Sequence, residues 1–394
     1  MNVKVLGTTH VGYFLSKEEA LDFAGKAAGV CYMPNDFETL MGEPKEKTLA
    51  RVSDTLKSGH HSVYDHVVYN LLFENIPKIL AMVLNNEGIY TTSEKSARYT
   101  KMNPSEEESI LYNKWNDIFK KIITEKYFEK YLAYFEGNEK RATVAIKKLA
   151  QENARYMISV FTPTTMVYSV SFRQINYIVS FFEEFIKTAE TTDFNQKLKE
   201  AMLEFIEEIP AEIKENLLTA SEKGRKISIF DSREERNEEF SENYCTTYNG
   251  TFAELAQAQR HRTLDYKMRF LTKAEFYVPE ILKENCELAK EWTKDITSIA
   301  HVYPQGMLVS IRERGTYEKF ILKCYERICG CAQLEIALQT KKTLDKYLEQ
   351  TKETNHEVYE ELKKCSNGAR CTFPYFKCNK RCVWGAKEAL TRKV

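Results

Sequence analysis

Several common features are missing from this sequence of 394 residues, and each absence excludes a class of protein. There is no net charge, because Lys and Arg together number 57 and Asp and Glu also number 57. A dedicated nucleic-acid binder normally has a basic excess, so we expect no nucleic-acid partner. No apolar run reaches the roughly 18 residues that a membrane-spanning helix needs, so we expect no membrane partner. Neither G-x-G-x-x-G nor G-x-x-x-x-G-K-[ST] occurs, which disfavours a Rossmann oxidoreductase and a P-loop NTPase.

A secretion signal is also missing from the first residues, which lack a basic region followed by an apolar stretch. We therefore expect a cytoplasmic protein whose ten cysteines are reduced thiols rather than a disulfide framework. Four of them lie near the C-terminus, at Cys365, Cys371, Cys378 and Cys382. Their number matches a small thiolate site such as structural zinc, although only the last gap has a common zinc spacing. An iron–sulfur cluster and free thiols are the alternatives.

The spacing of apolar residues predicts an α+β protein. Strands are expected at Lys4–Leu6, His66–Phe73, Met166–Ser171, Ile227–Phe230, Asn243–Thr251, Tyr266–Thr272 and Met307–Arg312. Helices are expected at Lys17–Ala28, Lys45–Lys57, Pro77–Leu84, Glu107–Phe135, Arg141–Ser159, Phe252–His261, Cys286–Ala300 and Tyr317–Leu348. This order recurs in condensed form after the charged stretch Ser221–Glu242. We interpret that stretch as a connection between two halves; the alternative is a solvated helix face within one domain.

Two separated segments contain residues suited to an anionic ligand. Arg260-His261-Arg262 ends a predicted helix, where cations are also favoured by the helix dipole alone. Ser96-Ala97-Arg98 lies about 160 residues upstream. On an extended segment Ser96 and Arg98 would point to one face, and a guanidinium with a hydroxyl suits a phosphate. Ser-x-Arg by itself is common in proteins, so the two segments carry weight only together.

Together the segments resemble the signature of the flavin-dependent thymidylate synthases, in which Arg-His-Arg is followed after seven residues by Ser-x-Arg. Phe270 stands where Ser would follow Arg262, and Asn86–Gly88 stand where Arg-His-Arg would precede Ser96, so each half contains what the other lacks. Arg327-Ile-Cys-Gly-Cys-Ala-Gln-Leu-Glu-Ile336 also resembles the family's Arg-x-x-x-x-Ala-Gln-x-Glu-Ile. Gly59–His66 is similar to the family's Gly-His-x-Ser/Thr-x-x-Glu-His, with Asp65 in place of Glu.

The resemblance implies roles for individual residues. Those expected to bind the substrate are Glu94, Ser96, Arg98, Arg155, Gln257 and Arg327. Those expected to bind the cofactor are Ser62, Arg260, His261 and Arg262. Arg327 is also the expected catalytic residue, because a cation beside the uracil carbonyl would stabilise negative charge on the ring. The first half has Phe182 where the second has Arg327, and the second half has Ala300 where the first has Arg155.

The same resemblance implies two copies of the flavin-dependent thymidylate synthase fold, each with a mixed sheet and long flanking helices. The units are expected at residues 1–222 and, condensed, at 223–350, followed by a Cys-rich tail at 351–394. Since the family is a homotetramer, two fused chains would form an equivalent homodimer with one composite site per chain.

The implied reaction is reductive methylation of dUMP at C5 to dTMP, with FAD as cofactor and methylenetetrahydrofolate and NADPH as co-substrates. Methylation of another uridine nucleotide is one alternative, and a catalytically inactive nucleotide-binding or assembly homologue is another. A zinc site at His60, His61, Asp65 and His66 is a further alternative, against which we favour packing.

Overall fold

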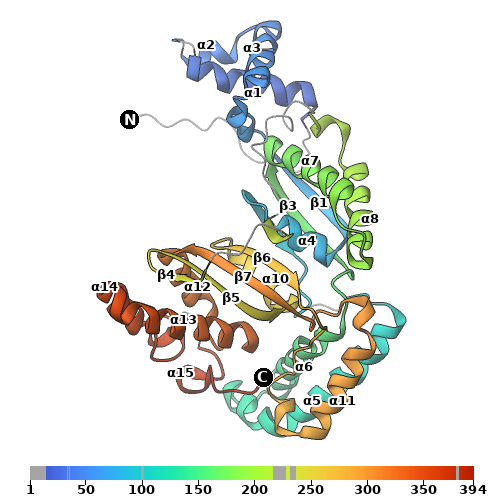
Figure 1. Ribbon diagram of the computed structural model, residues 1–394, viewed down its shortest axis with the longest axis vertical. Helices are drawn as coiled ribbons and strands as arrows, with labels where there is room; N and C mark the ends of the chain where they lie inside the picture. Colours follow the sequence, from blue (N-terminus) through green and yellow to red (C-terminus); the bar gives the residue numbers. More distant parts are fainter. Residues whose placement is uncertain are drawn as a thin grey trace. The chain divides into compact units, whose positions relative to one another are not determined.

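The computed structural model describes residues 15–32, 34, 36–98, 102–215, 228–230, 237–378 and 381–394 (Figure 1). The strand predicted at Lys4–Leu6 lies outside them. The described residues form two compact units. The first unit is drawn from residues 1–73, 89–93 and 166–226, and the second from residues 74–88, 94–165 and 227–394. These units differ from the predicted ones, which end at 222 and 350, because each is drawn from several stretches of the chain and three of the crossings, after residues 73, 93 and 165, lie within strands.

The first unit contains three helices from the start of the chain, α1 (Lys17–Tyr32), α2 (Phe37–Met41) and α3 (Lys45–Ser58). Helices α1 and α3 approach closely at Gly25, where a Cβ would lie 2.7 Å from the carbonyl oxygen of Thr48. After the 3₁₀ turn η1 (His61–His66), the unit is completed by α7 (Phe172–Thr188), α8 (Asp193–Glu208) and the turn η3 (Ala211–Ile213). The apolar face of α7 is buried, with Ile178 and Phe182 fully covered.

A three-stranded sheet contains β1 (Val68–Pro77), β2 (Tyr90–Glu94) and β3 (Pro163–Ser171) in the order β1-β3-β2. Buried and less buried residues alternate along β3, as the period of two in a strand requires when one face is covered. Between β1 and β2 lies the short helix α4 (Lys78–Leu84), in which every residue from Ile79 onward is buried.

The second unit contains a four-stranded sheet with the order β4-β5-β7-β6. Its strands are β4 (Glu239–Phe240), β5 (Asn243–Thr251), β6 (Asp265–Phe270) and β7 (Leu308–Thr316). All three pairings are antiparallel, so the predicted mixed sheet is wrong here. The strand predicted to include Ser228–Phe230 is wrong as well, since these residues form the 3₁₀ turn η4.

The helices of this unit are α5 (Glu106–Tyr134), α6 (Glu139–Ala154), α10 (Phe252–Ala258), α11 (Cys286–Ser298), α12 (Tyr317–Arg327), α13 (Leu334–Thr354), α14 (His356–Lys364) and α15 (Gly385–Glu388). Shorter 3₁₀ turns are η2 (Arg155–Met157), η5 (Gln259–His261), η6 (Leu282–Glu284), η7 (Ala300–Val302) and η8 (Arg370–Thr372). The single helix predicted at Tyr317–Leu348 is wrong, because α12 ends at Arg327 and α13 begins at Leu334. The interruption coincides with packing of the C-terminal segment against Gly330, where a Cβ would lie 2.7 Å from the Cys382 sulfur.

The long helices α5, α6 and α11 pack together around an aromatic core (Figure 1). Trp115 and Trp292 lie edge to face in it, with ring centroids 4.9 Å apart. Ala389 and Val394 belong to the same core, so the C-terminal residues are part of the second unit and not a separate tail. Within the described residues, none of the helices combines the length and apolar character needed to cross a membrane.

The order of elements recurs along the chain. Strand, short helix and strand (β1, α4, β2) correspond to β5, α10 and β6. Helix, 3₁₀ turn, strand and helix (α6, η2, β3, α7) correspond to α11, η7, β7 and α12. In both sheets the strand that comes third in this order lies in the middle, giving β1-β3-β2 and β5-β7-β6.

Candidate active site

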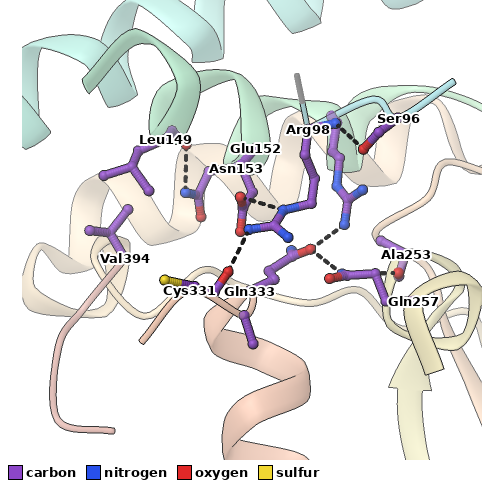
Figure 2. A network of polar contacts seen from close by, with 12 residues as sticks. Ser96, Arg98, Leu149, Glu152, Asn153, Ala253, Gln257, Cys331, Gln333 and Val394 are labelled. Atoms are coloured by element: carbon purple, nitrogen blue, oxygen red, sulfur yellow. Dashed lines mark hydrogen bonds and ion pairs between the residues drawn. The ribbon is translucent and has the colours of Figure 1, made fainter. Parts of the chain in front are cut away.

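Two of the predicted site residues, Arg155 and Gln257, meet at the side chain of Gln333, which lies just before α13 (Figure 2). Its Oε1 accepts hydrogen bonds from Arg155 Nη2 and from Gln257 Nε2. Arg327 Nη2 donates to the backbone oxygen of the same Gln257. The residues come from η2, α10 and the end of α12, so segments more than 170 residues apart in the sequence meet here.

Arg98 reaches the same region from the segment after β2. Its Nε donates to Glu152 at 2.6 Å, and its Nη2 donates to the backbone oxygen of Cys331 at 3.2 Å (Figure 2). Ser96 and Arg98 are not on an extended segment as predicted. The chain turns there, and the backbone N–H of Arg98 donates to Ser96 Oγ at 3.3 Å. The hydroxyl and the guanidinium are therefore neighbours through a turn.

Arg155 and Arg327, unlike Arg98, are buried and have no carboxylate partner among the described residues. Arg155 is 5% exposed and Arg327 is 8% exposed, and neither forms an ion pair with any described residue. Burial lowers the pKa of Arg155, and it lowers the pKa of Arg327 to about 10. Arg155 Nε, Arg327 Nε and Gln257 Oε1 are buried and have no hydrogen-bond partner among the described residues. Buried charges and donors of this kind are costly unless a ligand satisfies them.

A second set of buried polar groups supports Gln333 from behind. Gln333 Nε2 donates to the hydroxyl of Tyr156, and that hydroxyl donates to Glu335 Oε2 at 2.7 Å. Glu335 also accepts from the backbone N–H and the hydroxyl of Thr251. Burial raises the pKa of Glu335. Sequence reasoning did not assign Gln333 or Tyr156 to the site; the Ala-Gln-x-Glu motif was the signal that could have identified Gln333.

Glu94 was predicted to bind the substrate, but its hydrogen bonds lie elsewhere. Its carboxylate accepts from Lys78 at 2.5 Å and from Asn85 at 3.3 Å, and its side chain is 1% exposed. These contacts connect β2 to α4 and do not include the Gln333 network.

Arg260 and His261 end the turn η5, which follows α10, and Arg262 comes directly after them. Arg260 and Arg262 are both exposed, and Arg262 adopts a left-handed conformation with φ 53°. The side chain of His261 lies outside the described part of the structure. The neighbouring Gln259 is buried and donates to Met82 O and Asn86 Oδ1, both at 3.2 Å.

Ser62 and the histidines around it belong to the first unit. Ser62 is exposed in η1, whereas His61 is buried, with Nε2 3.1 Å from the backbone oxygen of Leu56. Asp65 accepts from Ser171 at 2.7 Å and pairs with Arg173 at 3.0 Å. His61 is thus a packing residue, in agreement with the favoured interpretation.

The cysteines are grouped differently from the prediction. Cys365 is buried beside Tyr325, whereas Cys382 lies beside Cys331. Across the described ranges, no three His, Cys, Asp or Glu side chains are arranged to hold a metal ion. Neither the four-cysteine site nor the histidine site is therefore formed. Cys329 and Cys331, which the single helix predicted at Tyr317–Leu348 would include, belong to the interruption between α12 and α13.

Two cavities lie near the second sheet. The larger, of about 530 Å³, is lined by Cys245, Lys267, Arg312, Lys319 and their neighbours and contains none of the predicted site residues. The smaller, of about 210 Å³, is lined partly by Glu254, Tyr277 and Glu335, and so reaches the polar groups behind Gln333.

Comparison with known proteins identifies similar chains. A flavin-dependent thymidylate synthase of Thermococcus onnurineus (strain NA1) is 24% identical over 155 residues, which are 36% of this chain and 56% of that protein. The chain thus spans little more than half the length of this relative. Two solved structures of the Helicobacter pylori enzyme ThyX with FAD and dUMP are 17% and 19% identical. They cover 47% and 50% of this chain and 88% and 94% of their own chains, with TM-scores of 0.27 and 0.28.

A family model provides the broadest match. The model described as Thymidylate synthase complementing protein matches residues 15–211, half of the chain. The resemblance seen in the motifs is confirmed, and the chain belongs to this family, that of the flavin-dependent thymidylate synthases.

Proposed function

We propose that this protein converts dUMP to dTMP by reductive methylation at C5, using methylenetetrahydrofolate, NADPH and FAD. The observation that supports this most strongly is one connected network, in which Arg155 and Gln257 hydrogen-bond to Gln333, Arg327 hydrogen-bonds to Gln257, and Arg98 hydrogen-bonds to Cys331 close by. Each half of the chain supplies residues that the other lacks, and the network contains residues from both halves.

The charge of this cluster suits a nucleotide monophosphate. Arg98 is balanced by Glu152, whereas Arg155 and Arg327 hydrogen-bond only to neutral amide or carbonyl oxygens in the described structure. Two buried, uncompensated positive charges match a phosphate and a uracil ring that gains negative charge during the reaction. A bound anion would offset the cost of burying these guanidinium groups.

The roles we assign follow this division. Ser96, Arg98 and Arg155 hold the phosphate, because a guanidinium offers paired N–H donors to its oxygens. Gln257 positions the nucleotide beside Arg327. Arg327 lies against the ring carbonyl and stabilises the negative charge that develops when C5 becomes nucleophilic. No cysteine is assigned a role in this step.

The exposed arginines fit the anionic part of FAD. Arg260 and Arg262 follow each other closely at the end of η5, and two exposed guanidinium groups suit a pyrophosphate. We assign these residues, together with His261 and Ser62, to cofactor binding. FAD, when bound, supplies the redox chemistry between NADPH and the one-carbon unit. The protein contributes binding, orientation and the electrostatic environment of the nucleotide.

We also propose that the chain arose by internal duplication. The matching strand orders β1-β3-β2 and β5-β7-β6, and the matching order of the surrounding helices, support this. One composite site per chain and a homodimer equivalent to a family tetramer follow from the same proposal.

Calorimetric titration with dUMP and with deoxyuridine tests the nucleotide site. Removing a charged hydrogen-bonding partner typically costs about 1.5–3 kcal/mol. Arg98→Ala should weaken dUMP binding by this amount and leave deoxyuridine nearly unchanged, because deoxyuridine has no phosphate. Arg327→Ala should weaken both ligands.

Lys290→Ala is the matched control, since it removes one positive charge from an exposed position on α11. Equal losses of deoxyuridine affinity in Arg98→Ala and Arg327→Ala would contradict the assignment. Binding of dUMP without turnover in the presence of FAD, NADPH and methylenetetrahydrofolate would favour the inactive homologue. Tighter binding of UMP than of dUMP would favour another uridine nucleotide.

A further inference from the structure

Three thiols that are distant in the sequence meet beside the candidate active site. The Cys331 thiol is within hydrogen-bonding reach of the sulfurs of Cys329 and Cys382. Cys331 lies in the interruption between α12 and α13, and Cys382 lies in the C-terminal segment before α15. The segment Ile328–Gln333 and the C-terminal segment are therefore in contact through sulfur.

Gly330 creates the space for this contact. A Cβ at this position would lie 2.7 Å from the Cys382 sulfur and 3.2 Å from Cδ1 of Trp384. Cβ atoms do not tolerate the first of these distances, so any other residue at 330 would displace the sulfur of Cys382. The absence of a side chain at Gly330 thus allows Cys382 to lie next to Cys331.

The surroundings of the three sulfurs differ, and the differences favour thiol exchange. The hydrogen bond from Cys331 and the backbone N–H groups of Trp384 and Gly385 lower the pKa of Cys382 to about 5. Hydrogen bonds to the sulfurs of Cys329 and Cys382 raise the pKa of Cys331, which keeps its proton, and the hydrogen bond from Cys331 also lowers the pKa of Cys329 to about 6. Cys331 is exposed and Cys382 is half-buried, whereas Cys329 is buried. A thiolate next to an accessible thiol is the arrangement that attacks disulfides and then resolves the product.

We propose that Cys331 and Cys382 are a redox-active pair that low-molecular-weight disulfides, such as glutathione disulfide, oxidise to an intramolecular disulfide. In the first step the Cys382 thiolate attacks one sulfur of the small disulfide, forms a mixed disulfide and releases one small thiolate. In the second step Cys331 loses its proton and attacks the Cys382 sulfur, which releases the other small thiol. The protein loses two electrons and the proton of Cys331 in total, and the small disulfide is reduced to one thiolate and one thiol.

The pair is placed where its oxidation would affect the nucleotide site. The backbone oxygen of Cys331 accepts the hydrogen bond from Arg98 Nη2 (Figure 2). The backbone oxygen of Ala332 accepts from Arg392 Nη2 at 2.6 Å, and Gln333 follows directly. A bond from Cys331 to Cys382 would pull on this short segment and so on the partner of Arg98. This consequence rests on the proposed function, whereas the thiol chemistry does not.

Peptide mapping under non-reducing conditions tests the pair. The full-length protein is reduced without oxygen, treated with glutathione disulfide, alkylated and digested with trypsin. We expect the peptide Ile328–Lys341 to be linked to the peptide Cys382–Lys387. Cys331→Ser and Cys382→Ser should each abolish this product, and Cys329→Ser should keep it. Cys286→Ser is the control at an exposed cysteine on α11.

Three results would contradict the proposal that Cys331 and Cys382 form a redox-active pair. One is mixed disulfides spread evenly over the exposed cysteines, including Cys286, without the linked peptides. Another is a product that requires Cys329 instead of Cys382. The third is a stoichiometric metal ion in the reduced protein that Cys331→Ser and Cys382→Ser both release, since the thiols would then be metal ligands.

Affinity for dUMP in the reduced and oxidised protein tests the link to Arg98. We expect oxidation to weaken binding on the order of fivefold or more, the lower range of coupling between sites, and Cys331→Ser to remove the difference. Equal affinities of the two forms would refute the link. A reduced protein that binds no dUMP would refute the proposed function. The linked peptides would still show whether Cys331 and Cys382 form a disulfide.

Discussion

Helices α7 and α12 occupy corresponding places in the two halves, yet their buried faces have opposite chemistry. Each follows the central strand of its sheet, and Phe182 and Arg327 are each the eleventh residue, counted from Phe172 and Tyr317. Phe182 is fully buried and packs edge to face on Phe205, with ring centroids 5.1 Å apart. Arg327 is buried too, but it hydrogen-bonds to the backbone of Gln257.

The same contrast appears one turn earlier on both helices. Ile178 on α7 is fully buried among apolar groups. Lys323 stands at the corresponding place on α12, where it is 2% exposed and pairs with the buried Glu313. One helix face therefore contributes to an apolar core in the first unit and to a charged interior in the second. Apolar burial stabilises a fold directly, whereas buried charges cost free energy and are expected where a ligand is bound.

Truncation of Phe182 should give the largest effect on stability. Phe182→Ala leaves a cavity at a fully buried position, and such changes cost about 3–5 kcal/mol. Thermal unfolding followed by circular dichroism should show the loss. Affinity for dUMP, measured on the folded protein, should stay the same, because the proposed nucleotide residues belong to the second unit. A loss below about 1 kcal/mol would mean that this helix face is not a core.

Replacement of Arg327 by an apolar side chain should affect stability in the opposite direction. Exchanging a buried charge for an apolar group of similar volume is often neutral or stabilising by about 1–4 kcal/mol. Arg327→Met should therefore raise the melting temperature or leave it unchanged, and abolish tight dUMP binding. Its folded pKa of about 10 lies below the usual value of 12.5, so the cost of the charge is constant below pH 10.

The change in melting temperature caused by Arg327→Met should accordingly be the same at pH 6 and pH 8. Lys290→Ala, which removes an exposed charge, should change the melting temperature little at either pH. Destabilisation of Arg327→Met by more than about 2 kcal/mol would show that Arg327 stabilises the fold and is not retained mainly for a ligand.

Local sequence was sufficient to predict the helices and strands whose two ends depend on neighbouring residues. The strand predicted at Asn243–Thr251 matches β5, and the helix predicted at Glu107–Phe135 differs from α5 by one residue at each end. Ser105 begins α5 with a capping box that includes Glu108, a signal that is visible in the sequence. The end of α12 was not predicted, because it depends on the C-terminal segment packed against Gly330 more than 50 residues later.

The candidate site shows the same limit. The motifs identified Arg98, Arg155, Gln257 and Arg327, and the structure brings them together. Gln333 was not assigned, since its importance lies in hydrogen bonds to residues 76 and 178 positions away. Glu94 was assigned by its position next to Ser96, but Lys78 and Asn85 hold it in a different place. Periodicity and motifs do not contain these long-range contacts.

The smallest expected difference concerns the first turns of α7 and α12. Ser171 caps α7, with its hydroxyl accepting from the backbone N–H of Gln174 at 3.1 Å and donating to Asp65 at 2.7 Å. Thr316 occupies the cap position of α12, but its side chain makes no cap hydrogen bond. Loss of an N-cap typically costs about 1 kcal/mol, so Ser171→Ala should destabilise by about this amount. Thr316→Ala should cost less, because no backbone N–H loses its partner. Urea unfolding of both variants measures the difference, and equal losses would mean that the apolar face, rather than the cap, determines where each helix begins.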